Sequence, residues 1–359
     1  MIEISTLLIL LALVAVPIGW LLPRDWALDG VAAWTLLVIA WLSPLSAVWL
    51  VGAAVLTPLG LRLGDQTRHR GAVAALLTLL LMGAFTASRL LPSGGIMWIS
   101  AAFFTLRHIH VIAEWWMERL AVPSVRAHLR YQLFLPVMIV GPIHRFPNFE
   151  RQSARRRLDG ADFLAGAERA LIGAFMAYVI SRQVEGAAFA IDVRLTGSSP
   201  FLRSWAGSAM SWISLFFDFA GMTAIALGTS LMLGLRLEEN FDQPWRAESL
   251  LDFWRRWHMT LSGWSLDYVF RPVMAISRSP LLGLIAAMLV IGLWHEFSAF
   301  YVLWSFWQAL GVVLTRMAMR WLPLPHVTGW PRRLLAPLSI LLWLSLARPV
   351  IDVLLRLLP

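Results

Sequence analysis

Apolar runs long enough to cross a lipid bilayer recur from one end of this chain to the other. A spanning helix needs about 20 apolar residues in a row, and a helix makes its backbone hydrogen bonds within its own segment, as a bilayer interior requires. The candidate runs are residues 4–22, 31–61, 71–91, 96–118, 163–180, 205–234, 281–298, 301–314 and 334–358. Allowing for loops, the pattern predicts an all-α, polytopic transmembrane protein with roughly eight to eleven spans.

The composition indicates the same fold class. Hydrophobic residues make up 59% of the 359 residues and charged residues 14%, which excludes an ordinary soluble domain. The apolar runs leave no room for a separate soluble domain, so we expect one multi-pass domain over residues 1–359. We expect this domain to lie in the cell (inner) membrane, in contact with the lipid bilayer.

The basic charge is carried by arginine alone, because the sequence contains no lysine and its net charge is +9. In a soluble protein this surplus would suggest nucleic acid, but in a membrane protein it is typical of cytoplasmic loops that face anionic lipid. We therefore expect no nucleic-acid partner. The absence of lysine and cysteine also excludes a Schiff-base mechanism and a cysteine nucleophile.

Arginine is concentrated in three blocks, residues 62–70, 119–130 and 145–157, whereas the turn at 92–95 is uncharged. The positive-inside rule predicts that the blocks are cytoplasmic and the turn external. On this topology, residues 182–203 form the longest external loop.

Residues 131–144 are apolar but lie between two arginine blocks. They are too few to cross the membrane and return as helices, so we expect a re-entrant or interfacial segment whose backbone is covered by protein or water. We expect His144, at its end, to be a surface histidine.

Among the ionisable side chains inside apolar runs, we single out His295 and Asp218, because such residues mark functional sites or ion pairs by default. His295 lies in LLGLIAAMLVIGLWHEFSAF, residues 281–300, where Gly292 and Ala299 would share its helix face. Position alone leaves open whether this histidine reacts or only hydrogen-bonds a neighbouring helix. Asp218 is expected to be an ion-paired structural residue.

The segment LDFWRRWHMTLSGWSLDY, residues 251–268, combines tryptophan with arginine. Indole rings favour the headgroup level of a bilayer, which predicts an interfacial segment. Asp252 and Arg256 have the spacing of a helical ion pair. A plain membrane-surface anchor remains an alternative for this stretch.

Four ordered motifs carry a family resemblance. They are Phe-Leu-Pro…Gly-Pro-Ile-His-Arg-Phe (134–146), Phe-Phe-Asp-Phe-Ala-Gly with Leu-Gly-Leu-Arg-Leu-Glu-Glu-Asn-Phe (216–241), Phe-Trp-Arg-Arg-Trp-His with Asp-Tyr (253–268), and Gly-Leu-Trp-His (292–295). In this order they resemble the membrane-bound O-acyltransferase family. Over about residues 95–315 the chain resembles the bacterial branch of this family with the alginate O-acetylation membrane subunit and the teichoic-acid D-alanylation membrane protein.

The resemblance implies transfer of an acyl group from a thioester to a hydroxyl. This reaction needs a base for the hydroxyl proton, and histidine suits that task. The resemblance assigns the catalytic role to His295 and a second functional role to His258, which we expect nearer the cytoplasmic entrance. The candidate substrate-binding residues in the same motifs are Trp257, Arg256, Asn240 and Trp294.

The resemblance further implies a cytoplasmic acyl thioester such as acyl-CoA as donor, and no cofactor or metal. The expected acceptor is an envelope or exported polysaccharide, or a periplasmic acyl-relay protein, and the expected acyl group is acetyl. D-alanyl transfer and lipid acylation remain open, as does a polytopic transporter or channel. The chain has Glu296 where this branch commonly has glycine, and Ala220 and Met222 within a motif that commonly reads Ser-Gly-Tyr.

Overall fold

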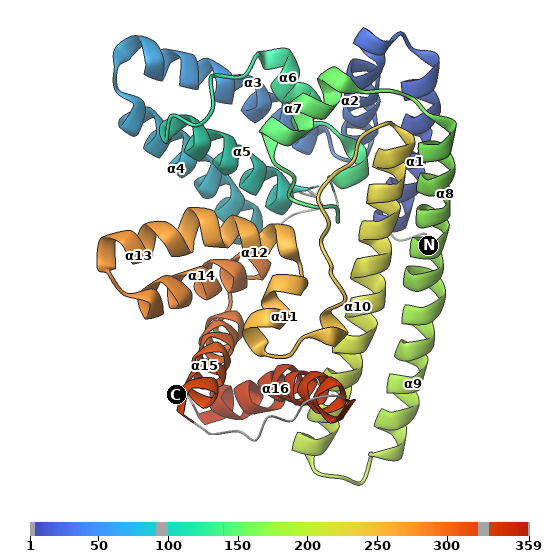
Figure 1. Ribbon diagram of the computed structural model, residues 1–359, viewed down its shortest axis with the longest axis vertical. Coiled ribbons are helices and arrows are strands. Elements are labelled where there is room, and N and C mark those ends of the chain that lie inside the picture. The colour runs from blue at the N-terminus through green and yellow to red at the C-terminus, as the bar shows by residue number, and fades with distance from the viewer. Residues whose placement is uncertain (1–3, 91–99, 139, 322–329, 358–359) are drawn as a thin grey trace. The chain divides into compact units, whose positions relative to one another are not determined.

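The computed structural model describes residues 4–90, 100–138, 140–321 and 330–357, and every regular element in these ranges is helical (Figure 1). The α-helices are α1 (Ile4–Leu21), α2 (Arg24–Leu42), α3 (Pro44–Thr67), α4 (Arg70–Leu90), α5 (Ala101–Trp116), α6 (Val125–Gln132), α7 (Phe146–Arg155), α8 (Gly160–Phe175), α9 (Ser181–Arg194), α10 (Pro200–Met232), α11 (Leu250–Arg256), α12 (Met259–Ser265), α13 (Arg271–Ser277), α14 (Pro280–His295), α15 (Ala299–Trp321) and α16 (Trp330–Leu357). The all-α prediction is confirmed. The turn expected at 92–95 lies outside the described residues.

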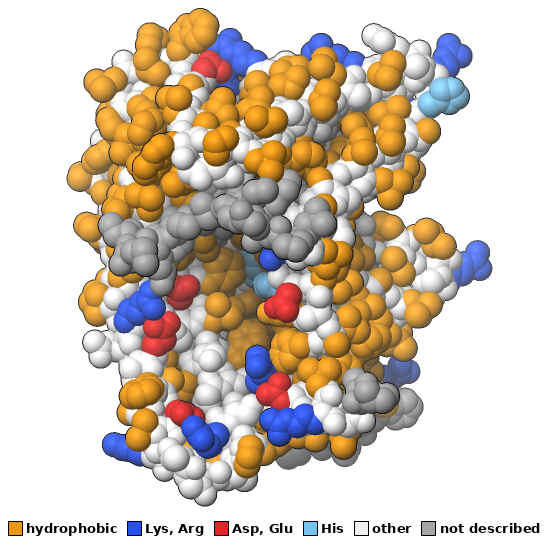
Figure 2. Space-filling view, turned by 180° about the vertical axis from the view of Figure 1, so that it is seen from behind, with side chains coloured by type: hydrophobic (Ala, Val, Ile, Leu, Met, Phe, Trp, Pro, Cys, Tyr) orange, Lys and Arg blue, Asp and Glu red, His pale blue; other side chains and the backbone are white. Residues whose placement is uncertain are grey.

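Seven helices are long and apolar enough to cross a membrane. They cover residues 24–42, 44–67, 70–90, 160–194, 200–232, 299–320 and 334–357, and two shorter apolar helices cover 7–21 and 280–295. Figure 2 shows many hydrophobic side chains at the surface on the face that it presents, as expected where lipid replaces water. The chain is therefore a multi-pass membrane protein, while the number of spans remains a prediction.

The helices form two compact units. The first comprises residues 1–173 and 222–238, and the second comprises residues 174–221 and 239–359. The expectation of one functional domain over residues 1–359 remains a prediction.

In the first unit, the long apolar run at 31–61 is divided between two helices. Helix α2 ends at Leu42, and Ser43 caps α3 by accepting a hydrogen bond from the backbone N–H of Ser46 at 3.3 Å. Pro44 follows at the first helical position, where its missing N–H costs nothing. Serine and proline together thus divide this run into two helices.

The first unit also buries an irregular segment that follows α6, as predicted for residues 131–144. The fully buried guanidinium of Arg107 donates to the backbone carbonyls of Tyr131 and Gln132, each at 3.2 Å. The hydroxyl of Tyr131 donates to the carbonyl of His144 at 2.6 Å. The expectation that His144 is at the surface is wrong, because its side chain is 0% exposed. Irregular backbone inside a membrane protein needs internal polar partners, so polar side chains gather around it.

The prediction of a loop over residues 182–203 is wrong, while the external position of this segment stays a prediction. Helix α9 continues to Arg194 and α10 begins at Pro200, which leaves a short turn between them. An ion pair of 2.8 Å joins Arg203 to Asp192 across this turn. Most of the polar residues in this stretch therefore lie on helix, where charged side chains can pair with neighbours one turn away.

In the second unit, α14 packs against α13 and α15 (Figure 1). Ser279 caps α14 by accepting from the N–H of Leu282, and Pro280 occupies its first turn. The helix ends at His295, after which Glu296 is extended. The prediction that Ala299 shares the helix face of His295 is therefore wrong, because Ala299 begins α15.

Indole N–H groups tie α16 to its neighbours in the second unit. Trp212 of α10 donates to the carbonyl of Leu344 at 3.2 Å, and Trp307 of α15 donates to the carbonyl of Trp343 at 3.0 Å. The rings of Trp307 and Trp343 also stack, with their centroids 4.4 Å apart. These contacts bring α16 to the pocket described below.

Candidate active site

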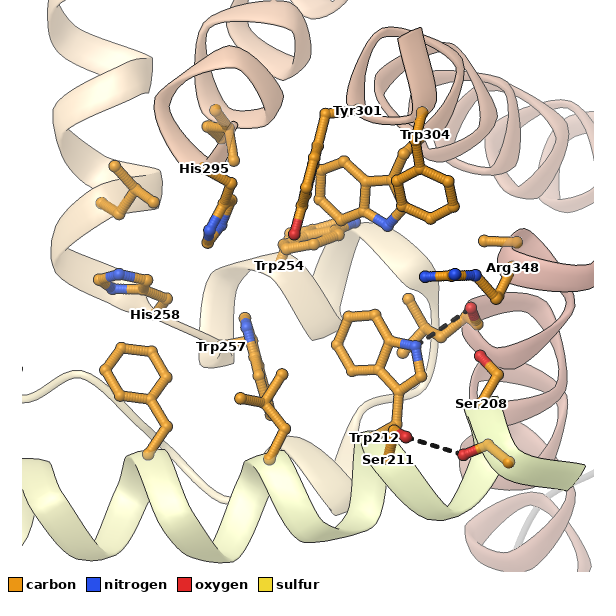
Figure 3. Close-up of a pocket in the computed structure, with 18 of the residues that line it drawn as sticks. Ser208, Ser211, Trp212, Trp254, Trp257, His258, His295, Tyr301, Trp304 and Arg348 are labelled. Atoms are coloured by element: carbon orange, nitrogen blue, oxygen red, sulfur yellow. Dashed lines mark hydrogen bonds between the residues drawn. The ribbon is translucent and has the colours of Figure 1, made fainter. Parts of the chain in front are cut away.

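A pocket of about 540 Å³ lies within the second unit, and α10, α11, α12, α14, α15 and α16 all contribute to its lining. Figure 3 shows His258 and His295 at one end and Arg348 and Ser208 at the other. Aromatic side chains of α11 and α15 lie between these ends. The pocket therefore has an imidazole end, an aromatic middle and a polar end.

His295 stands at the imidazole end, as the last residue of α14, and its side chain is exposed in the pocket. The ring of Tyr301 stacks on it, with centroids 5.6 Å apart and planes 16° apart. Trp304 approaches the same imidazole edge-on at 6.3 Å. The start of α15 thus holds the ring in place while leaving it accessible to a substrate.

Gly292, one turn before His295, allows α14 and α15 to approach closely. A Cβ at this position would lie 2.1 Å from the hydroxyl oxygen of Ser305 and 2.7 Å from the carbonyl oxygen of Tyr301. Only glycine fits there without displacing backbone. This close approach fixes where His295 emerges from α14 relative to the stacked ring of Tyr301.

His258 is buried beside the same end of the pocket, immediately before α12. Its backbone is left-handed, with φ 43° and ψ 52°, which costs energy in a residue with a Cβ. Strained backbone of this kind clusters at functional sites. Its Nδ1 lies 3.3 Å from Oδ1 of Asn240, so the neutral tautomer that donates from Nδ1 carries its lone pair on Nε2.

Asn240 supports the left-handed backbone of His258 through hydrogen bonds to the residues around it. Its side-chain oxygen accepts a hydrogen bond from Thr260 Oγ1 at 2.5 Å, and its backbone carbonyl accepts from the N–H of Met259 at 2.8 Å. Asn240 is fully buried and does not line the pocket. In this geometry Asn240 supports His258, and its role as a substrate contact stays a prediction.

Burial lowers the pKa of His258 to about 3, and the neighbouring imidazole of His295 adds to the effect. Removal from water disfavours the charged imidazolium. His258 is therefore neutral at any pH near neutrality, and it is a weak base there. The two histidines differ in exposure and hence in the chemistry open to each.

The remaining predicted substrate contacts fall in different places. Trp257 lines the pocket and is 7% exposed. The ring of Trp294 lies 6.0 Å from that of His258 and 4.8 Å from that of His295, so it bridges the two histidines. Arg256 is not part of the lining and pairs with Asp252 at 3.0 Å, as its spacing predicted.

The structure thus brings His258 and His295 to one pocket. The expectation that His258 lies nearer a cytoplasmic entrance stays a prediction, because a shared pocket does not fix the side of the membrane on which it opens. Within the described residues, no three histidine, cysteine or acidic side chains are grouped so as to hold a metal ion.

Several lining residues were missed from the sequence. Arg348 and Asp352 were read only as part of a final apolar run, although ionisable residues inside such a run are a signal of function. Tyr301 carried no signal of its own, because its stacking on His295 depends on the turn between α14 and α15.

Asp218 is half-buried and lines a separate pocket with Glu185.

Residues 117–347 match the model of MBOAT, the membrane-bound O-acyltransferase family. The chain belongs to this family. The match covers more than half of the chain and includes both histidines of the pocket, and it ends one residue before Arg348.

Curated relatives agree with this assignment. The chain is 30% identical over 227 residues to the probable alginate O-acetylase AlgI of Pseudomonas aeruginosa, covering 61% of this chain and 42% of the relative. It is 27% identical over 248 residues to the teichoic acid D-alanyltransferase of Bacillus subtilis, covering 64% and 62%. A peptidoglycan O-acetyltransferase of Helicobacter pylori is 30% identical over 204 residues, covering 54% and 38%. The chain therefore matches about half the length of these relatives.

Proposed function

We propose that this membrane-bound O-acyltransferase moves an acyl group, in the first instance acetyl, from a thioester such as acyl-CoA to a hydroxyl of an envelope or exported polysaccharide. The observation that carries the proposal is the exposed imidazole of His295 in a pocket shared with the buried, neutral His258. The names of the relatives, which act on alginate, teichoic acid and peptidoglycan, support an envelope acceptor.

His295 acts as the general base. One of its ring nitrogens takes the proton of the acceptor hydroxyl as the hydroxyl oxygen attacks the thioester carbonyl carbon. The carbon–sulfur bond then breaks, the new ester forms, and the imidazolium returns the proton to the leaving thiolate. Histidine is the side chain most often used for such a proton transfer.

His258 positions the substrate and does not take the proton. With a pKa of about 3 it is too weak a base near neutral pH. Its Nδ1 lies 3.3 Å from Oδ1 of Asn240, a contact that orients its ring beside His295 at the imidazole end of the pocket. The aromatic middle, with Trp254 and Trp257, excludes water from the acyl group.

The test uses the whole protein reconstituted in phospholipid vesicles, with acetyl-CoA as donor and a neutral oligosaccharide as acceptor. We expect His295→Ala to lose at least about a hundredfold in kcat, the usual contribution of a positioned base. The matched control is His69→Ala, because His69 is an exposed histidine outside the pocket.

Several outcomes would count against this function. Full turnover in His295→Ala would remove the assigned base. Transfer only from a D-alanyl thioester would replace acetyl by the chemistry named for the Bacillus subtilis relative. Movement of the oligosaccharide or donor across the vesicle membrane without ester formation would indicate a transporter.

A further inference from the structure

The polar end of the pocket is built from residues that the family match only partly covers. Arg348 and Asp352 of α16 both lie beyond residue 347, where the match ends. Ser204 and Ser208 of α10 face them, four residues apart and therefore on one side of their helix. Figure 3 shows Arg348 and Ser208 at this end, away from the two histidines.

Hydrogen bonds join these residues into one group. Arg348 Nε donates to Asp352 Oδ2 at 3.2 Å, and Ser204 Oγ donates to the same oxygen at 3.4 Å. The guanidinium also lies over the ring of Phe300, 5.0 Å from its centroid. The aromatic and ionic contacts together fix the plane of Arg348.

The group keeps hydrogen-bonding capacity toward the pocket. Within the described part of the chain, the two terminal amino groups of Arg348 make no hydrogen bond, and its side chain is 60% exposed. These amino groups supply N–H donors, the second oxygen of Asp352 supplies an acceptor, and the hydroxyl of Ser208 supplies both. Donors and acceptors are thus presented side by side.

The formal charge of this end is balanced. Among the described lining residues, Arg348 and Asp352 are the arginine and the carboxylate of the pocket, and their charges cancel. A carboxylate or phosphate ligand would meet Asp352 beside the arginine, and like charges repel. Adjacent hydroxyls of a sugar both donate and accept, so they match the group without a charge.

We propose that Ser204, Ser208, Arg348 and Asp352 form an acceptor subsite that selects an uncharged, polyhydroxylated sugar over an anionic one. Aromatic faces of Tyr301 and Trp304 lie between this subsite and His295, where a sugar ring can pack on them. The subsite thus specifies the acceptor class of the proposed acyl transfer, and the proposal rests on that function.

The kinetic test compares a neutral gluco-oligosaccharide with an oligogalacturonate of the same length in vesicles, at saturating acetyl-CoA. We expect the wild-type protein to favour the neutral acceptor in kcat/KM. Asp352→Asn should move this preference about tenfold toward the anionic acceptor, because it leaves the positive charge of Arg348 unbalanced. Arg348→Gln should raise KM for the neutral acceptor about tenfold, the value of one hydrogen bond to a charged group, with kcat little changed.

The matched controls are Asp267→Asn and Arg271→Gln. These residues form an ion pair with the same spacing of four, at 2.5 Å, but neither lines the pocket. A wild-type preference for the anionic acceptor would overturn the proposal. So would acceptor preferences in Asp352→Asn and Arg348→Gln that equal those of the controls.

A binding experiment separates this subsite from the proposed function. Calorimetric titration of the gluco-oligosaccharide into detergent-solubilised His295→Ala protein needs no turnover, and the same titration is made with Asp352→Asn or Arg348→Gln added. Weaker binding in the double variants together with absent acyl transfer in wild type would support the subsite and refute the acyltransferase. Acyl transfer that depends on His295, with oligosaccharide binding unaffected by either substitution, would refute the subsite alone.

Discussion

Gly292→Ala tests whether the close approach of α14 to α15 sets the position of the catalytic imidazole. The new Cβ would lie 2.1 Å from Ser305 Oγ and 2.7 Å from the carbonyl oxygen of Tyr301, whereas ordinary contacts begin near 3.4 Å. The serine oxygen can rotate away, but the carbonyl belongs to the backbone of α15. The two helices therefore have to separate by roughly 0.7 Å at this level, the shortfall of the carbonyl contact.

This separation acts on His295 directly. The residue ends α14 one turn beyond Gly292, and its ring stacks on that of Tyr301, whose carbonyl is the atom displaced. Displacements near 1 Å cost on the order of a hundredfold in rate, so we expect kcat to fall between about tenfold and a hundredfold. Overpacking should also lower the free energy of unfolding by about 1–3 kcal/mol.

The assay measures acetyl transfer and thermal unfolding of the purified protein in the same detergent. Gly186→Ala is the matched control, because a Cβ there would meet nothing within 4 Å. The double variant Gly292→Ala with Ser305→Ala removes the 2.1 Å contact but keeps the carbonyl contact, so it should recover only part of the loss. Wild-type turnover in Gly292→Ala would refute the reasoning, and full recovery in the double variant would show that the carbonyl contact is unimportant.

Further predictions concern the second histidine and the topology. His258→Gln should raise KM more than it lowers kcat, and equal, substrate-independent losses in His258→Gln and His295→Ala would contradict the division of roles. Because the pKa of His258 is about 3, this side chain is already neutral between pH 5 and 9. His258→Gln should therefore leave the midpoint of the acidic limb of the kcat/KM profile unchanged, and a shift of more than about one pH unit would assign that limb to His258. In a chain without native cysteine, Ser198→Cys should react with an impermeant thiol reagent in intact cells, and Ala161→Cys only after permeabilisation. The reverse pattern would invert the topology.

The apolar runs determined the fold class because a bilayer accepts few backbone structures. The lengths of these runs predicted spanning helices. The arginine and tryptophan residues of 251–268 distinguished that stretch from a spanning helix. The motif histidines could be picked out from sequence because an ionisable residue in an apolar run, here His295, needs a reason to be there. The helical spacing of Asp252 and Arg256 likewise predicted their ion pair.

Helix ends were less certain, because they depend on caps and on local pairing. The polar stretch at 182–203 was expected to be a loop, but α9 continues to Arg194, with an ion pair from Asp192 to Arg203 at its end. Polarity alone does not distinguish a solvated helix from a loop. The surface position expected for His144 failed for a related reason, because an irregular buried segment draws polar groups inward.

The sequence by itself determined that this is a helical membrane protein with two motif histidines, because membrane length and motif order are local properties of the chain. Only the tertiary structure decided that His258 and His295 share one pocket, and that Asn240 supports His258 from behind. It also brought Arg348, about fifty residues after His295 in the chain, to the far end of that pocket. Such contacts arise from the packing of α10, α14, α15 and α16. Packing brings together residues that are far apart in the sequence, and their spacing along the chain does not predict that they meet.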